Sequence, residues 1–167
     1  MNQAGIYAGT FDPITLGHLD VIERAARVFP RLVVAVARNT TKTTLFTADE
    51  RAELIRKSIG PFPNVEVEVF GGLLVEYARR KGIHCVIRGL RAFSDFEFEF
   101  QMALTNRKLA EDIETLFLMP KEDYSFISSG TVREIASLGG NVEEFAPPAS
   151  CEALRQKLHP PADRGTP

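Results

Sequence analysis

The fold is decided by the stretch Gly9-Thr10-Phe11-Asp12-Pro13-Ile14-Thr15-Leu16-Gly17-His18. It follows a short apolar run, residues 4–8, and precedes a segment whose apolar residues recur at helical spacing: Leu19, Ile22, Ala26 and Phe29. Open α/β sheets bind ligands at such strand-to-helix turns. Backbone amides at the helix start can also face phosphate oxygens. The stretch therefore predicts a nucleotide phosphate site.

The rest of the chain alternates strand and helix patterns, which predicts an α/β fold with a doubly wound, five-stranded parallel sheet covered by helices on both faces. Strands are expected at 5–8, 32–37, 65–70, 84–87 and 115–118, and helices at 17–29, 48–59, 73–81, 93–110, 130–137 and 151–158. Phe96, Phe98 and Phe100 alternate as in a strand, but Phe93, Phe96, Phe100 and Leu104 form a helical stripe, and we assign a helix. Thr47 with Glu50 predicts a capping box, and Gly82 a helix end.

Length and composition bound the function. The 167 residues are 44% hydrophobic, which predicts one domain, residues 1–158, with a disordered tail at 159–167. A net charge of −2 provides no basic field for nucleic acid or an anionic membrane. Cys85 and Cys151 have no metal-ligand spacing and predict no disulfide framework. Without a signal peptide or an apolar run of about 18 residues, a cytoplasmic protein is expected.

His18 falls in the first turn of the expected helix. The positive end of the helix dipole should lower its pKa and favour a neutral ring that donates one hydrogen bond, which suits a phosphate oxygen. A capping or packing histidine is the alternative, and Thr10, Gly9 and Gly17 in the same turn favour the phosphate role. The stretch has neither the phosphate loop of nucleotidases nor the dinucleotide fingerprint of dehydrogenases.

Two further segments could handle phosphate. In Arg88-Gly89-Leu90-Arg91, after a buried strand, the guanidinium groups could make charge-assisted hydrogen bonds to phosphate, although solvated loop arginines are the alternative. Ser128 and Ser129 precede a helix and offer hydroxyls and amides to a phosphate, although these residues taken alone favour an ordinary N-cap.

These motifs resemble a known family. Residues 15–18 have the Thr-x-Gly-His form of the nucleotidyltransferase superfamily, and a closer match is to bacterial phosphopantetheine adenylyltransferases. The matching stretches, in order and spacing, are residues 7–18, 46–51, 87–92, 95–97, 117–120 and 126–129. The resemblance spans roughly residues 4 to 158 and implies a Rossmann-like fold.

The resemblance implies that the phosphate of 4′-phosphopantetheine attacks the α-phosphorus of ATP in line, giving dephospho-CoA and pyrophosphate in coenzyme A biosynthesis. It implies catalytic roles for His18, Thr10 and Lys42, and acceptor contacts from Thr10, Lys42, Leu74 and Arg88. The implied ATP site comprises Thr10, Phe11, His18, Gly89, Leu90, Arg91, Glu99, Tyr124, Ser125, Phe126, Ile127, Ser128, Ser129 and Gly130. Leu73 and Met102 are further candidates for the arm of the acceptor.

Mg²⁺ is expected through the ATP phosphates rather than through protein ligands. A homohexamer and feedback by CoA are also implied. The chain departs from the family pattern at Gly72, Phe98 and Gly130, where aspartate, tyrosine and serine or threonine are usual.

Three alternatives remain. A relative with another phosphate acceptor, such as nicotinate mononucleotide or glycerol 3-phosphate, would share the His18 site. A catalytically silent nucleotide-binding regulatory module would bind ATP without turnover. A tRNA-linked protein is disfavoured because the sequence has no basic stripe and no evident anticodon-binding extension.

Overall fold

The computed structural model describes residues 4–38, 43–91 and 93–160. The strands are β1 (Ala4–Gly9), β2 (Arg31–Ala37), β3 (Val65–Phe70), β4 (Cys85–Gly89) and β5 (Glu114–Leu118). The helices are α1 (Leu16–Val28), α2 (Ala48–Ser58), α3 (Leu74–Lys81), α4 (Phe93–Leu109), α5 (Ser129–Ser137) and α6 (Pro148–Leu158), with a 3-10 turn at Glu122–Tyr124. The part of the expected tail from residue 161 onward lies outside the described residues.

Within the described residues the strands form one five-stranded sheet in the order β3-β2-β1-β4-β5. All neighbouring strands are parallel, and Ile6 on the central strand is in register with Val33 on β2 and with Val86 on β4. The chain runs outward from β1 to β3 and then returns to the other side of β1 at β4. This reversal confirms the predicted doubly wound, Rossmann-like sheet and places the ligand-binding crevice at the carboxyl end of β1.

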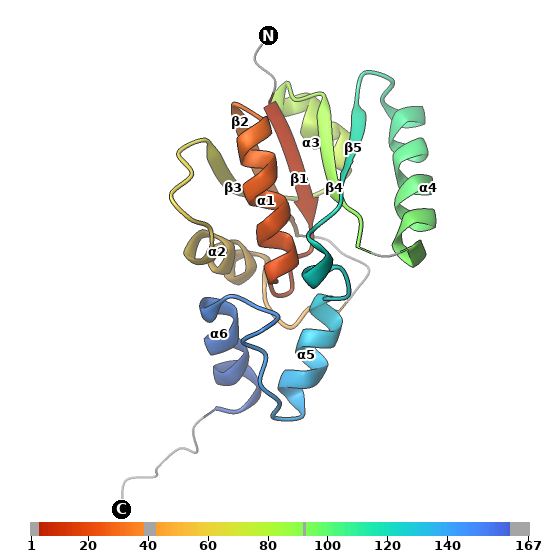
Figure 1. Ribbon diagram of the computed structural model, residues 1–167. Coiled ribbons are helices and arrows are strands. Elements are labelled where there is room, and N and C mark those ends of the chain that lie inside the picture. The colour runs from red at the N-terminus through yellow and green to blue at the C-terminus, as the bar shows by residue number, and fades with distance from the viewer. Residues whose placement is uncertain (1–3, 39–42, 92, 161–167) are drawn as a thin grey trace, which may run out of the picture.

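Each face of the sheet has its own apolar core, because successive side chains of a strand point to opposite faces. Tyr7 belongs to the core that includes residues of α1 and α2, whereas Ile6 and Ala8 belong to the core that includes α3. Figure 1 shows α1 in front of the sheet and α3 behind it. The predicted helical cover of both faces is therefore confirmed.

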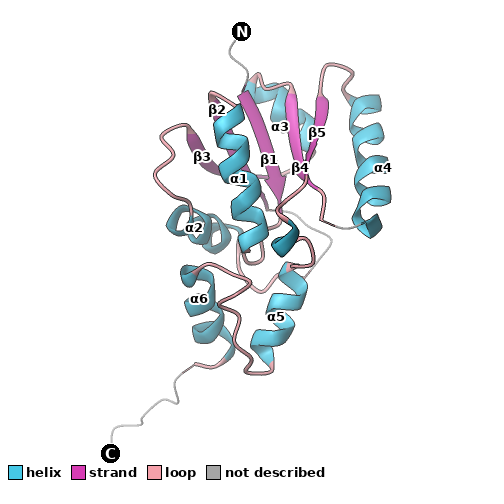
Figure 2. Cartoon of the chain, in the orientation of Figure 1, coloured by secondary structure: helices cyan, strands magenta, loops and turns pink. Residues whose placement is uncertain are grey.

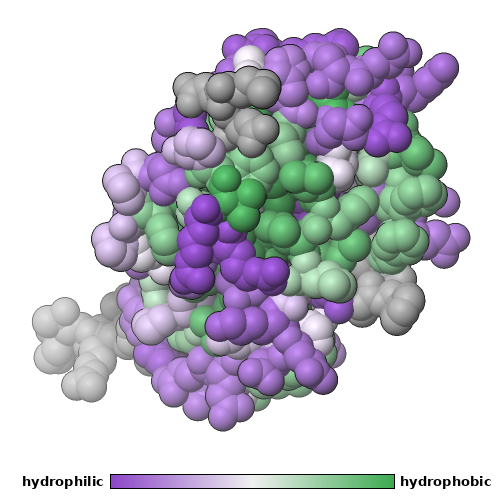
Figure 3. All heavy atoms as spheres, turned by 45° about the horizontal axis from the view of Figure 1, so that its top comes forward, coloured by the Kyte–Doolittle hydropathy of each residue, from purple (hydrophilic) through white to green (hydrophobic). Residues whose placement is uncertain are grey.

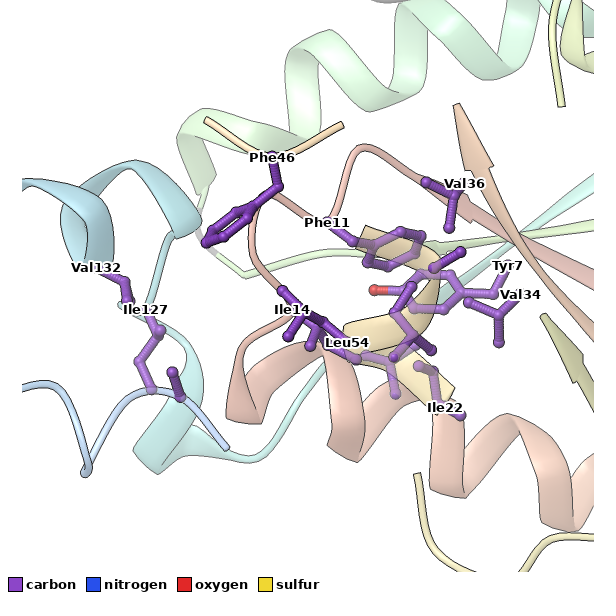
Figure 4. Packing of buried hydrophobic residues seen from close by; sticks show 14 of the residues in the cluster. Tyr7, Phe11, Ile14, Ile22, Val34, Val36, Phe46, Leu54, Ile127 and Val132 are labelled. Carbon is purple, nitrogen blue, oxygen red and sulfur yellow. The ribbon is translucent and has the colours of Figure 1, made fainter. Parts of the chain in front are cut away.

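The last two helices lie beyond the carboxyl ends of the strands, below the sheet in Figure 2. The first core continues to them through Ile127 and Val132, as Figure 4 shows alongside Phe11, Ile14 and Phe46. This packing brings the start of α5 next to the loop that follows β1, where Ser129 contacts Pro13, 116 positions away in sequence. No helix in the described ranges is long and apolar enough to cross a lipid bilayer.

The predicted elements are all present, and their ends differ by a few residues. The capping box of Thr47 and Glu50 is confirmed, and Gly82 ends α3 in the left-handed conformation at φ 64°. β4 extends through Arg88 and Gly89, which pair with β5, so these residues belong to the strand rather than to the following loop. α6 begins at Pro148, before the expected Cys151, because proline fits the first turn of a helix.

Candidate active site

A cavity of about 410 Å³ opens at the carboxyl edge of the sheet. It is bounded by the loop after β1, the end of β4, the start of α5 and α4. Among the residues predicted for the site, the cavity is lined by Thr10, Phe11, His18, Arg88, Gly89, Arg91, Glu99, Ser128, Ser129 and Gly130. Leu90 and residues 124–127 are not among its lining residues. Lys42 lies outside the described residues.

The capping geometry of α1 fixes the orientation of His18. Thr15 is the N-cap, its hydroxyl accepts a hydrogen bond from the His18 backbone N–H at 3.4 Å, and its own backbone N–H donates to His18 Nδ1 at 3.1 Å. Because Nδ1 accepts this hydrogen bond, the proton of a neutral ring resides on Nε2. The capping histidine and the phosphate-binding histidine are thus compatible interpretations, since capping leaves Nε2–H free to act as a donor.

Burial keeps the His18 ring neutral. Burial, with smaller contributions from the positive charges of Arg91 and Arg88, lowers the pKa of His18 to about 3. The sequence predicted a lowered pKa from the helix dipole, whereas burial is the largest cause in the structure. Phe11 contributes to this burial, with its ring edge-on to the imidazole at a centroid distance of 5.1 Å.

The lowered pKa predicts a specific pH dependence of stability. Between about pH 6.5 and pH 3 the unfolded chain binds a proton at residue 18 that the folded protein does not bind, so the free energy of unfolding should fall as the pH falls. The stabilisation that comes from the lowered pKa of His18 is fully present above about pH 6.5. His18→Gln keeps one donor and one acceptor but cannot titrate. In this variant the free energy of unfolding should fall less steeply with falling pH, by up to about 1.4 kcal/mol per pH unit. Urea unfolding of both proteins at pH 7, 5.5 and 4.5 measures the difference, and equal slopes would contradict the prediction.

Arg88 and Glu99, which the resemblance assigns to different substrates, contact each other. Arg88 Nε and Nη2 donate to the two Glu99 carboxylate oxygens at 2.7 and 2.5 Å, and Nη1 donates to the Ala8 carbonyl at 2.6 Å. Burial lowers the pKa of Arg88, but the hydrogen bonds and charge of Glu99 outweigh this effect and raise it. The pair attaches α4 to the sheet at the edge of the cavity.

The start of α5 is tied to the loop after β1. The Ser129 hydroxyl donates to the Pro13 carbonyl at 2.8 Å, and Ser128 caps the helix by accepting from the Thr131 N–H at 3.0 Å. Arg91 Nη1 donates to the Ile127 carbonyl at 2.7 Å. The capping interpretation of Ser128 is therefore correct, and capping coexists with its position on the cavity wall.

A second cavity of about 210 Å³ adjoins the first. It lies between α3 and α4, and Arg88, Phe98 and Glu99 line both cavities. Leu73, Leu74 and Met102, the candidates for an apolar acceptor groove, line only the second. The structure thus places a polar cavity beside a more apolar one, with Arg88 at their boundary.

Sequence reasoning missed three polar residues that organise the site. Asp12 and Arg133 line the first cavity as an ion pair with a 3.2 Å separation, and Arg51 is buried behind it. Arg51 had a usable signal, because it falls on the helix face of Ala48, Ala52 and Ile55, where an apolar residue is expected. Asp12 stands inside the quoted stretch of residues 9–18, but its contact with Arg133 depends on the tertiary fold.

In the described ranges no group of at least three His, Cys, Asp or Glu side chains is placed to hold a metal ion. The carboxylate nearest the loop, Asp12, accepts hydrogen bonds from the Leu45 and Phe46 amides and pairs with Arg133.

The doubly wound sheet, the Thr-x-Gly-His loop and the cavity at the sheet edge define a nucleotidyltransferase. Residues 6–135 match the family model described as cytidylyltransferase-like. The fold is also that of the nicotinic acid mononucleotide adenylyltransferase of Plasmodium falciparum, with a TM-score of 0.68, 14% identity and coverage of 93% of this chain and 96% of that chain.

Curated relatives narrow the family. The chain is 55% identical over 161 residues to the phosphopantetheine adenylyltransferase of Anaeromyxobacter dehalogenans (strain 2CP-C), covering 96% of this chain and 98% of that protein. It is also 55% identical over 156 residues to the phosphopantetheine adenylyltransferase of Desulforudis audaxviator, covering 93% and 96%. The chain belongs to the phosphopantetheine adenylyltransferase family.

Proposed function

We propose that this protein transfers the adenylyl group of ATP to 4′-phosphopantetheine, giving dephospho-CoA and pyrophosphate. The observation that carries the proposal is the pair of adjoining cavities with Arg88 at their boundary. One is lined by His18, Arg91 and helix-start residues that suit a triphosphate, and the other is lined by leucine, phenylalanine and methionine side chains that suit an aliphatic arm. The phosphate of such an acceptor would lie between them.

The chemistry requires positioning rather than a base. An oxygen of the acceptor phosphate attacks the α-phosphorus of ATP, a new P–O bond forms, and the bond from the α-phosphorus to the bridging oxygen breaks to release pyrophosphate. Since the nucleophile is already an anion, no side chain has to remove a proton. Alignment of two polyanions and stabilisation of charge on the α-phosphate then supply most of the catalysis.

The described residues can divide this work. His18 Nε2–H and the Thr10 hydroxyl would bind α-phosphate oxygens at the transition state, and Arg91 with Ser128 and Ser129 would hold the β- and γ-phosphates. Residues 89–91, Glu99 and residues 124–130 would complete the ATP site. Arg88 and Leu74 would bind the acceptor, and Lys42, which lies outside the described residues, would hold its attacking phosphate. Mg²⁺ would enter on ATP, held by phosphate oxygens and water.

Assembly into a homohexamer is part of the proposal and is supported by apolar side chains left exposed on α4 and near β5. They are Phe96, Phe98, Phe100, Met102, Leu104, Leu109, Leu116 and Met119. Figure 3 shows apolar residues gathered on the side where Figure 1 places α4. Such a contiguous patch is typical of an interface. Sedimentation that shows only an 18.5 kDa species would reject the hexamer.

Feedback by CoA follows the same chemistry, because CoA carries the pantetheine arm and phosphates of the product. We propose that CoA competes for the two adjoining cavities. Inhibition of turnover by CoA that is relieved by 4′-phosphopantetheine would support this, and inhibition independent of the acceptor concentration would reject it.

The test of the activity is pyrophosphate release from ATP and Mg²⁺ with 4′-phosphopantetheine, nicotinate mononucleotide, glycerol 3-phosphate or no acceptor. Release only with 4′-phosphopantetheine, with dephospho-CoA identified by mass, is the expected result. Release with another acceptor would keep the His18 chemistry and reject the acceptor. ATP binding without turnover would favour the regulatory module.

A further inference from the structure

Arg51 connects three separate segments behind the phosphate cavity. Its side chain comes from the first turn of α2 and is 1% exposed. Nε donates to the Phe46 carbonyl at 3.1 Å, and Nη1 donates to the Thr10 carbonyl at 2.5 Å and to the Ala37 carbonyl at 3.0 Å. Among the described residues no carboxylate hydrogen-bonds to this guanidinium. The dipoles of these carbonyls and the charge of the Asp12 carboxylate therefore stabilise the buried guanidinium, which ties its position to the backbone around it.

Two of the three carbonyls, those of Thr10 and Phe46, belong to the loops after β1 and before α2, and the third is at the end of β2. Thr10 follows β1, whereas Ala37 and Phe46 stand on either side of residues 38–45, which include the cavity-lining Thr43 and Thr44. Asp12, in the loop after β1, also connects the two loops. Its carboxylate accepts hydrogen bonds from the Leu45 and Phe46 amides at 2.8 and 2.9 Å. Together the two side chains fix the distance between the loops.

The backbone next to Thr10 needs such support. Phe11 has φ 51°, a left-handed conformation that is uncommon for a residue with a large side chain. Residues in this region cost on the order of 1–3 kcal/mol and persist where their surroundings hold them. The Arg51 hydrogen bond to the preceding carbonyl and the packing of the Phe11 ring on Tyr7 and His18 are the contacts that hold it.

We propose that Arg51 is a positioning residue for adenylyl transfer, which holds Thr10 and the described residues 43–46 in the geometry that the transition state requires. The inference rests on the proposed function, because it assigns Thr10 to the α-phosphate. Arg51 lies behind the loop and does not line the cavity, so it acts through Thr10 rather than by touching substrate. ATP should still bind through Arg91 and α5 when Arg51 is altered, whereas the α-phosphate contact should be misplaced.

The variant that tests this is Arg51→Lys, which keeps the charge and loses the planar fork that reaches several carbonyls. The matched control is Arg56→Lys on the same helix, because Arg56 is exposed and donates to the Val67 carbonyl on β3, outside the cavity. Each protein is assayed below its melting transition. Arg51→Lys should lower kcat by about 10- to 100-fold with the KM for ATP changed by less than about threefold, while Arg56→Lys stays at the wild-type values.

Two measurements separate positioning from simple stability. In the Thr10→Ala background, Arg51→Lys should have almost no further effect on kcat, because the group through which it acts is gone. Hydrogen exchange of the peptide that contains Leu45 and Phe46 should become faster in Arg51→Lys and not in Arg56→Lys. Hydrogen exchange can be measured without turnover. If the wild-type protein has no activity, the proposed function is rejected, but exchange still tests whether Arg51 holds the backbone at Leu45 and Phe46.

Several outcomes would overturn the proposal. One is an unchanged kcat in a folded Arg51→Lys protein. Another is a double variant in which the effects of Arg51→Lys and Thr10→Ala on kcat multiply. The third is hydrogen exchange that becomes faster uniformly along the whole chain. If Arg51→Lys does not fold, Arg51→Gln replaces it, since its amide can donate two hydrogen bonds without a buried charge. If neither folds, Arg51 is required for the fold itself and the positioning role is rejected.

Discussion

Replacing His18 by alanine should lower kcat by about a hundredfold or more while the protein stays folded, because one preorganised donor to developing transition-state charge is typically worth that much. The Thr15 N–H donates to Nδ1, so the proton of the neutral ring lies on Nε2. Because the neutral ring already carries this proton, it can donate a hydrogen bond to the α-phosphate as negative charge develops there, without any prior proton transfer. The KM for ATP should change much less, since Arg91 and the start of α5 remain.

Two controls identify the lost donor as the cause. His18→Gln retains an N–H donor and an oxygen that can accept from Thr15, and it should recover part of the lost kcat. The exposed His84, which lies outside the cavity, should tolerate alanine without a change in turnover. Steady-state kinetics with thermal melts of all three variants make the comparison. A folded His18→Ala enzyme with wild-type kcat would remove His18 from the mechanism.

The fold was predictable because its signals are local. The apolar run at residues 32–37 and the alternation of valine and glutamate at residues 65–70 both have strand length. The Thr47–Glu50 pair marks a helix start that the structure confirms. The ambiguous Phe-rich segment is a helix, and Phe96 and Phe100 stack on its surface at a centroid distance of 5.6 Å. Its weak amphipathic pattern has a physical cause, since much of its apolar surface is exposed in the monomer.

Much of the candidate site was also predictable, because its residues stand at the carboxyl ends of strands or at helix starts. The contacts among them were not. The pairing of Arg88 with Glu99 joins β4 to α4, and the hydrogen bond from Arg51 to Thr10 joins residues 41 positions apart. Neither spacing follows from a local pattern. The predicted role of Lys42 stays a prediction, because it lies outside the described residues.

Arg88→Met should raise the KM for 4′-phosphopantetheine by about a hundredfold or more, because Arg88 is the cation at the boundary of the two cavities and can bind a phosphate with two parallel hydrogen bonds. Methionine keeps an unbranched apolar stem and removes the guanidinium with its charge. The KM for ATP should change less, because Arg91, Ser128 and Ser129 line the first cavity independently. The matched control is Arg107→Met, which breaks the surface pair with Glu114.

The same substitution also tests how Glu99 is held. The Glu99 side chain is 12% exposed, so removing Arg88 would leave a mostly buried carboxylate without its ion-pair partner. Such a change destabilises a protein by about 3–5 kcal/mol. Adding Glu99→Gln should restore most of the lost stability, because the buried charge is gone, without restoring affinity for the acceptor. Urea unfolding and acceptor titrations of the single and double variants separate the two roles. If the double variant regained the wild-type KM for the acceptor, Arg88 would be a partner of Glu99 and not a ligand of the substrate phosphate.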